Sequence, residues 1–90
     1  MNTVIFARGN NIKTQVEQGR EYARQKDHTV VAVIVAQGKE LPEIIKGLGK
    51  EVDCVLMKDM ARLSRKMHEN LQIQHELKTD CGVQLIQKWQ

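Results

Sequence analysis

The chain alternates between short apolar runs and segments with helical spacing, and this alternation constrains its fold more than any other feature. The clearest run is 29–35, TVVAVIV, which is almost entirely β-branched and typical of a strand. The runs at 3–8, 52–57 and 83–86 predict three further strands. Because the 29–35 run has hardly a polar position, we expect it to be buried on both faces, as in a parallel sheet.

Three helices are expected between these strands. The turn at 9–11, Gly-Asn-Asn, has N-cap chemistry, and the helix after it has its inward face at Ile12, Val16, Gly19 and Ala23. The second helix begins near Pro42, which fits a first turn, and is capped by Gly49. The third runs to about Thr79, with an apolar face expected at Leu63, Met67, Leu71, Ile73 and Leu77.

The order β-α-β-α-β-α-β predicts an α/β fold, a small three-layer sandwich with a mainly parallel four-stranded sheet. We expect a single domain spanning 1–90, because the sequence contains no repeat, linker or low-complexity stretch. No apolar run approaches the roughly 20 residues of a membrane span, and the start lacks the pattern of a secretory signal. The fourth strand lies close to residue 90 with no helix after it, so an edge or face of the sheet is expected to stay open to a partner.

The net charge and the cysteines exclude few of the possible functions. The net charge of +3 is compatible with a nucleic-acid partner and equally with ordinary surface charge. Cys54 and Cys81 have no CxxC spacing and no histidine at a metal-like interval, so we expect no metal site and two reduced thiols in the cytoplasm. His68 and His75 are expected to be solvated. The P-loop and GxGxxG motifs are absent, and no cofactor is expected.

Three arginines follow strands of the expected sheet at their carboxyl ends, where open α/β sheets bind ligands. Arg8 follows the first strand, and Arg62 and Arg65 follow the third. A guanidinium group is always charged and donates paired hydrogen bonds to phosphate oxygens. The sequence therefore predicts a phosphate-binding site formed by these arginines. The alternative to a phosphate site is that Arg62 and Arg65, which are three residues apart, only form surface ion pairs with Asp59 and Glu69.

Five segments occur in a family-like order along nearly the whole chain: FARGNN (Phe6–Asn11), QVEQGREYA (Gln15–Ala23), VVAVIVAQG (Val30–Gly38), LPEIIKGL (Leu41–Leu48) and DCVLMKDMARLSR (Asp53–Arg65). Together they resemble the N-terminal catalytic domain of the resolvase/invertase serine recombinases. The resemblance implies the same α/β fold. It also implies an ancestral activity of DNA strand cleavage and rejoining through a phosphoserine link.

The resemblance places Asn10 where the family has its nucleophilic serine. An amide has no activatable hydroxyl, and losing one essential catalytic group typically costs about 10⁴–10⁶ in rate. Ser64, the only serine in the chain, matches a non-nucleophilic serine of the family, and we expect neither it nor Thr14 to substitute. Three positions that are polar in the family's site are occupied here by Ala36, Leu41 and Ala61. Three arginines of that site are matched by Arg8, Arg62 and Arg65.

The sequence thus predicts a resolvase-like domain of a mobile element that is a pseudoenzyme. We expect it to act by association with itself or with a full-length recombinase, and by weak, non-specific DNA binding with a log–log salt slope no steeper than about −3. The family's long dimerisation helix and DNA-binding domain would lie beyond residue 90, so specific DNA recognition is not expected from these residues. Two alternatives stay open: a recombinase fragment that retains DNA binding or strand exchange, and a binder of small anions.

Overall fold

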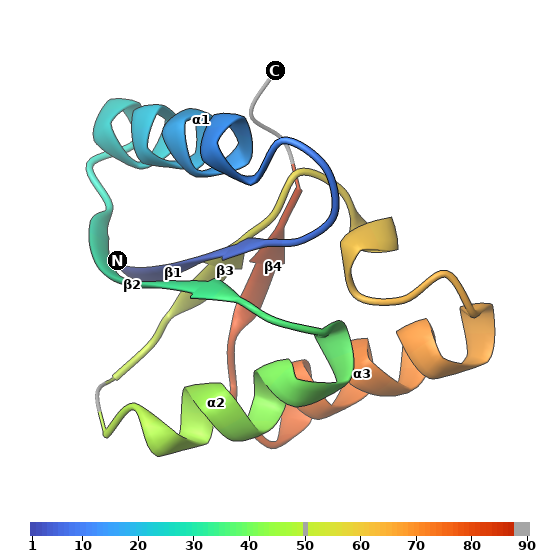
Figure 1. Cartoon of the computed structure of the whole chain (residues 1–90). Coiled ribbons are helices and arrows are strands. Elements are labelled where there is room, and N and C mark those ends of the chain that lie inside the picture. The colour runs from blue at the N-terminus through green and yellow to red at the C-terminus, as the bar shows by residue number, and fades with distance from the viewer. Residues whose placement is uncertain (50, 88–90) are drawn as a thin grey trace.

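The computed structural model describes residues 1–49 and 51–87 (Figure 1). Its strands and α-helices are β1 (Asn2–Ala7), α1 (Ile12–Gln25), β2 (Thr29–Val35), α2 (Leu41–Gly47), β3 (Cys54–Leu56), α3 (Met67–Thr79) and β4 (Gln84–Ile86). Two short 3-10 turns, η1 (Gly38–Glu40) and η2 (Met60–Arg62), precede α2 and follow β3.

The four strands form one parallel sheet in the order β2-β1-β3-β4. Helix α1 covers one face of this sheet, and α2 and α3 lie side by side on the other (Figure 1). The predicted α/β sandwich is therefore confirmed, and each observed strand lies within about two residues of its predicted ends.

Strand β1 lies at the centre of the sheet and is buried on both faces, since residues 3–7 are all fully inaccessible. Its Ile5 side chain packs beneath α1, where a Cβ on Gly19 would lie only 3.1 Å from Ile5 Cγ2. Val4 and Phe6 point to the other face, into a larger aliphatic core that α2 and α3 close with Leu41, Ile45, Ile73 and Leu77.

The prediction that residues 29–35 would be buried on both faces is wrong. Strand β2 is an edge strand, only Ile34 in it is buried, and Val35 is 58% exposed. Its β-branched composition suits a half-buried pleated surface as well as a central one, and the chain places β1 at the centre instead.

The predicted apolar faces of two helices also need correction. Helix α3 begins at Met67, so Leu63 packs into the core ahead of the helix, while Met67 and Leu71 are 78% and 59% exposed. Only Ile73 and Leu77 of the predicted set are buried within α3. In α1 the buried residues are Gln15, Gly19 and Ala23, so the inward face is turned toward Gln15 and away from Ile12 and Val16.

Gly38 sets the closest approach between the two loops at the carboxyl end of the sheet. It is buried, and a Cβ there would overlap the backbone carbonyl of Leu63. Leu63 is itself fully buried in the main core, so it has little freedom to move away.

Gly38→Ala is therefore expected to lower the free energy of unfolding by about 1–3 kcal/mol, the usual cost of overpacking. Urea unfolding followed by circular dichroism measures this. Gly47→Ala is the matched control, because Gly47 lies in α2 and a Cβ added there would have nothing within 4 Å, so the variant should be neutral or slightly stabilised. Equal unfolding midpoints for Gly38→Ala and wild type would contradict the packing described.

Candidate anion-binding site

A pocket of about 240 Å³ lies at the carboxyl end of the sheet, where β1 and β3 are neighbours. Its lining consists of Arg8, Gly9, Ala61, Arg62 and Arg65. The structure thus brings together the three arginines that the sequence places after these strands. They come from two segments about 50 residues apart in the chain, and they meet because parallel strands end at the same side of a sheet.

Arg8 and Arg62 hold each other in place through reciprocal hydrogen bonds. Arg8 Nη1 donates to the carbonyl of Arg62, and Arg62 Nη1 donates to the carbonyl of Arg8, each over 3.2 Å. Gly9 makes this approach feasible: its φ is +88°, and a Cβ there would lie 2.7 Å from Arg62 Nη1. A guanidinium has five N–H donors, so each arginine keeps most of its donors for a ligand.

The charge of the pocket is partly compensated. Arg62 Nε lies 3.7 Å from Asp59 Oδ1, which confirms one of the two alternative ion pairs. This contact is too long for a hydrogen bond, and within the described residues both atoms are buried without a hydrogen-bond partner. Arg65 is exposed, and in the described part of the chain no ion pair joins it to Glu69. Three guanidinium groups against one carboxylate leave the pocket positive.

Gln15 fixes the loop that carries Arg8, a role that the sequence pattern did not predict. Gln15 is 2% exposed; its Nε2 donates to the carbonyls of Arg8 (2.9 Å) and Asn10 (2.7 Å), and its Oε1 accepts from the Arg8 N–H (3.2 Å). The N-cap lies within the predicted turn, at Asn11, but the expected side-chain capping bond is absent. Asn11 is in a left-handed conformation, with φ 59°. The sequence feature that indicates an inward-facing Gln15 is its spacing of four and eight residues from Gly19 and Ala23, which places all three on one face of the helix.

Asn10 and Ser64 lie beside the pocket without lining it. Asn10 is exposed and directly follows Gly9. Ser64 is 7% exposed, and its hydroxyl accepts a hydrogen bond from the Lys66 N–H over 3.1 Å. The pocket lining thus offers hydrogen-bond donors and positive charge, which bind an anion, but no hydroxyl, thiol, imidazole or carboxylate to react with one.

Two other groups of polar side chains lie at the opposite end of the sheet, where the strands begin, and the first surrounds Thr3. Buried Thr3 Oγ1 lies 3.0 Å from both Cys54 Sγ and His28 Nδ1. Burial raises the pKa of the Cys54 thiol, which keeps it protonated and unreactive at neutral pH. The cluster therefore serves packing at the start of β1, and neither cysteine forms a disulfide.

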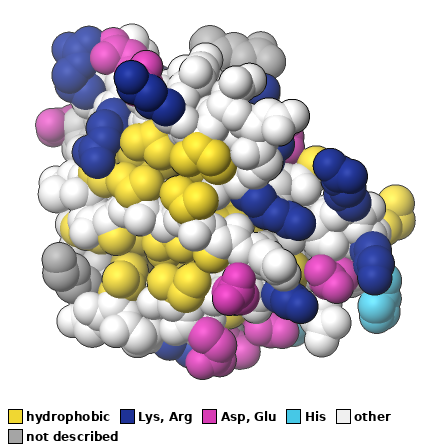
Figure 2. Space-filling view, in the orientation of Figure 1, with side chains coloured by type: hydrophobic (Ala, Val, Ile, Leu, Met, Phe, Trp, Pro, Cys, Tyr) yellow, Lys and Arg dark blue, Asp and Glu magenta, His cyan; other side chains and the backbone are white. Residues whose placement is uncertain are grey.

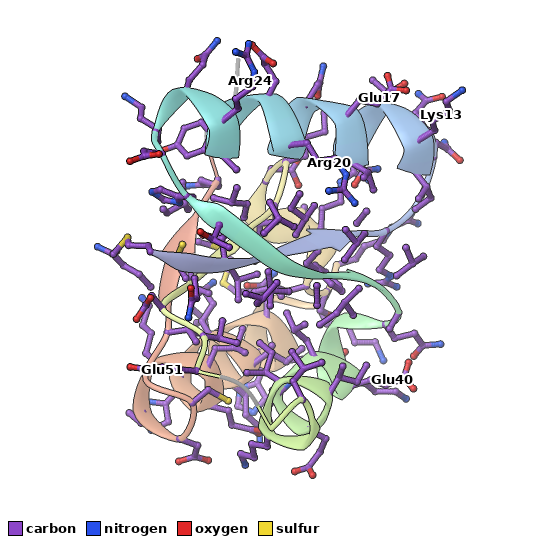
Figure 3. All side chains as sticks on the ribbon, turned by 90° about the vertical axis from the view of Figure 1, so that its left-hand side faces the viewer. Lys13, Glu17, Arg20, Arg24, Glu40 and Glu51 are labelled. Atoms are coloured by element: carbon purple, nitrogen blue, oxygen red, sulfur yellow. The ribbon has the colours of Figure 1, made fainter. Side chains whose placement is uncertain are left out.

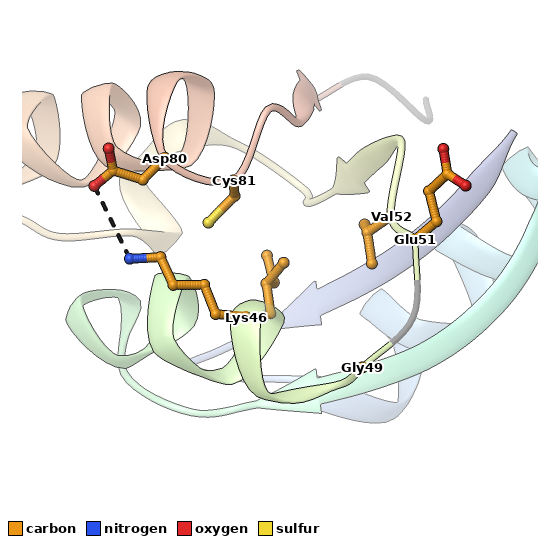
Figure 4. Close-up of a pocket in the computed structure, with 7 residues that line it drawn as sticks. Lys46, Gly49, Glu51, Val52, Asp80 and Cys81 are labelled. Atoms are coloured by element: carbon orange, nitrogen blue, oxygen red, sulfur yellow. Dashed lines mark ion pairs between the residues drawn. The ribbon is translucent and has the colours of Figure 1, made fainter.

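A second pocket, of about 350 Å³, lies between the ends of α2 and α3 (Figure 4). It has one lysine against two carboxylates: Lys46 Nζ lies 3.9 Å from Asp80 Oδ2, and Glu51 stands on the opposite wall (Figure 4). Burial raises the pKa of Cys81 at the edge of this pocket, so its thiol is also a weak nucleophile. The lining carries more negative than positive charge and therefore does not favour an anion.

No protein-family model, curated protein or solved structure matches the chain. The resemblance to serine recombinases therefore stays a prediction from the five segments quoted above. Across residues 1–49 and 51–87, no group of three or more metal-binding side chains occurs, and none of the helices is long and apolar enough to cross a bilayer.

Gln15→Leu is expected to cost about 1–3 kcal/mol of stability, because it leaves backbone groups of Arg8 and Asn10 without partners at a poorly hydrated site. Urea unfolding measures this loss. Gln18→Leu, an exposed position on the same helix, is the matched control and should unfold like wild type. A Gln15→Leu variant as stable as Gln18→Leu would show that the loop does not depend on Gln15.

Proposed function

We propose that the chain is a resolvase-like domain that has lost catalysis and binds nucleic-acid phosphate through the pocket of Arg8, Arg62 and Arg65. The convergence of these three guanidinium groups in one pocket is the observation that carries the proposal. Arginine side chains that are held by their own hydrogen bonds lose little conformational freedom on binding an oxyanion. The same arrangement supports binding of a phosphate diester without any further group.

The absence of a reactive group in the pocket lining supports the loss of catalysis. Three positions that the resemblance would assign to polar active-site residues are apolar here, and two of them pack into the fold. Leu41 is fully buried in the main core, and Ala36 packs against it. The alternative, a recombinase fragment with residual strand exchange, would need a nucleophile from outside this lining.

Duplex DNA binding by the wild type should weaken as salt rises, with a log–log slope of about −3 or shallower, since at most three arginines contact phosphates. Changing Arg8, Arg62 and Arg65 together to alanine should abolish most of this binding and flatten the slope. Fluorescence anisotropy with labelled duplex across a salt series measures both. The matched control changes Lys26, Lys39 and Lys78 to alanine, which removes equal charge from exposed positions outside the pocket.

Equal loss of affinity in both triple variants would mean that only net charge matters, which contradicts a phosphate pocket. A covalent protein–DNA adduct formed by the wild type on a denaturing gel would contradict the loss of catalysis. The Asn10→Ser variant tests how much of the ancestral site is left. We expect no adduct from it, because Ala36, Leu41 and Ala61 also differ from the family pattern.

We further propose that the chain pairs with a second copy of itself through the free edge of β2. This seven-residue strand contains no charged residue and no proline, and such an edge is a template for another strand. An apolar strip runs along it on the molecular surface, between basic side chains on the α1 side and acidic ones on the α2 side (Figure 2). Antiparallel pairing about Ala32 would satisfy the open hydrogen-bonding groups of both edges.

The charges beside β2 fit such a pair along α1. Figure 3 shows Lys13, Glu17, Arg20 and Arg24 along the helix over β2. An antiparallel second α1 can place Glu17 of each copy beside Arg20 of the other. On the α2 side, Glu40 would approach Glu51 of the partner (Figure 3), but exposed charges of this kind contribute under about 1 kcal/mol. A ladder of hydrogen bonds at about 0.5–1.5 kcal/mol each outweighs this repulsion.

Sedimentation should therefore show a concentration-dependent dimer that persists at high salt, in contrast to DNA binding. Val35→Lys should weaken the dimer at least about tenfold, because it places a charge on the strand edge. Leu71→Lys is the matched control, since Leu71 is 59% exposed and Val35 58%, and it lies on α3. A strict monomer, or a Val35→Lys dimer as tight as the control, would contradict pairing through β2.

A further inference from the structure

We propose that the arginine pocket is the phosphate half of a nucleotide site, whose second half is a pocket along α3 that accepts the base. This inference rests on the proposed phosphate binding and adds the chemical class of the ligand. This α3 pocket is about 320 Å³ and shares the lining residues Ala61 and Arg65 with the arginine pocket, so the two lie side by side. Its size alone reaches the range of small-ligand sites, about 300–1,000 Å³.

The wall of the α3 pocket is apolar at two exposed positions. Met67 and Leu71 line it, and they are two of the four large apolar side chains that stay exposed in the described residues. They stand four residues apart on α3, so they form one continuous ridge on the helix. Because Leu63, Ile73 and Leu77 already fill the core beneath, this ridge has no role in packing the domain. A flat apolar ligand would cover it favourably.

Asn70 joins the two pockets rigidly. Its Nδ2 donates to the carbonyls of Met60 (2.7 Å) and Ser64 (2.9 Å), which ties α3 to the segment that carries Arg62 and Arg65. Its Oδ1 accepts from Gln74 Nε2 over 2.6 Å. Gln74 also lines the pocket, and its carbonyl oxygen takes no part in this bond, so it can serve as an acceptor for an amino group of a ligand.

These features together select a nucleotide. The arginine pocket attracts the negative phosphate, and the exposed Arg65 guanidinium between the two pockets offers a planar cation on which a base can stack. Met67 and Leu71 supply apolar contact, and Gln74 supplies an acceptor. A free nucleotide and an unpaired nucleotide of a single strand share this chemistry. A base inside a duplex does not, because it is already stacked and paired.

Isothermal titration with adenosine 5′-monophosphate, ribose 5-phosphate and inorganic phosphate tests the base pocket. The wild type should bind the nucleotide at least about tenfold more tightly than ribose 5-phosphate, as one stacked base provides. In M67S/L71S the affinities for the nucleotide and for ribose 5-phosphate should become about equal, while the affinity for inorganic phosphate should not change. Both changes are at exposed positions, so the fold should persist, and V16S is the control for a half-exposed apolar position outside both pockets.

Equal wild-type affinity for the nucleotide and ribose 5-phosphate would overturn the base pocket and leave phosphate binding standing. A ratio that survives in M67S/L71S would overturn the assignment to α3. Failure to bind any of the three phosphates would overturn this inference together with the proposed function. A 5′-phosphorylated single-stranded tetranucleotide that binds more tightly than the mononucleotide identifies a strand as the source, and the reverse order identifies a free nucleotide. Tighter binding of a blunt duplex than of its single strand would overturn the base pocket.

Discussion

The complete burial of β1 is the constraint on which the rest of the structure depends. Every side chain from Thr3 to Ala7 is inaccessible, so both faces of the strand need cover along its whole length. Helix α1 provides one cover, and it can approach closely because Gly19 has no side chain above Ile5. Arg8 directly follows this strand and is the first residue after its buried stretch that reaches solvent, so its position follows from where the burial ends.

The pocket is rigid because its two segments bind each other's backbone. The guanidiniums of Arg8 and Arg62 each bond the carbonyl of the other, and Gln15 bonds the Arg8 N–H and the carbonyls of Arg8 and Asn10 in the β1–α1 loop. These hydrogen bonds replace the sheet ladder where β1 and β3 end. A ligand that enters the pocket meets donors already held in place, which lowers the entropic cost of binding.

The alternation of apolar runs was sufficient to predict the strands, helices and the meeting of Arg8, Arg62 and Arg65 at one end of the sheet. Periodicity carries no information on strand order, however, so it could not place β2 at an edge. Leu63 and Met67 have helical spacing, yet residues 64–66 between them are not helical and α3 begins only at Met67. Gln15 was missed because a glutamine on a helix normally faces water, and only the loop geometry gives it a buried partner.

Binding and catalysis place different demands on such a pocket, so the proposed phosphate binding does not require a catalytic group. An oxyanion is held by charge and by fixed N–H donors, which the arginines supply. Transfer of a phosphoryl group needs a nucleophile as well, and the lining of the arginine pocket contains none. The exposed ridge of Met67 and Leu71 beside Arg65 adds apolar surface that neither folding nor phosphate binding requires. A ligand with a base attached to its phosphate is the chemistry that uses both parts of this surface.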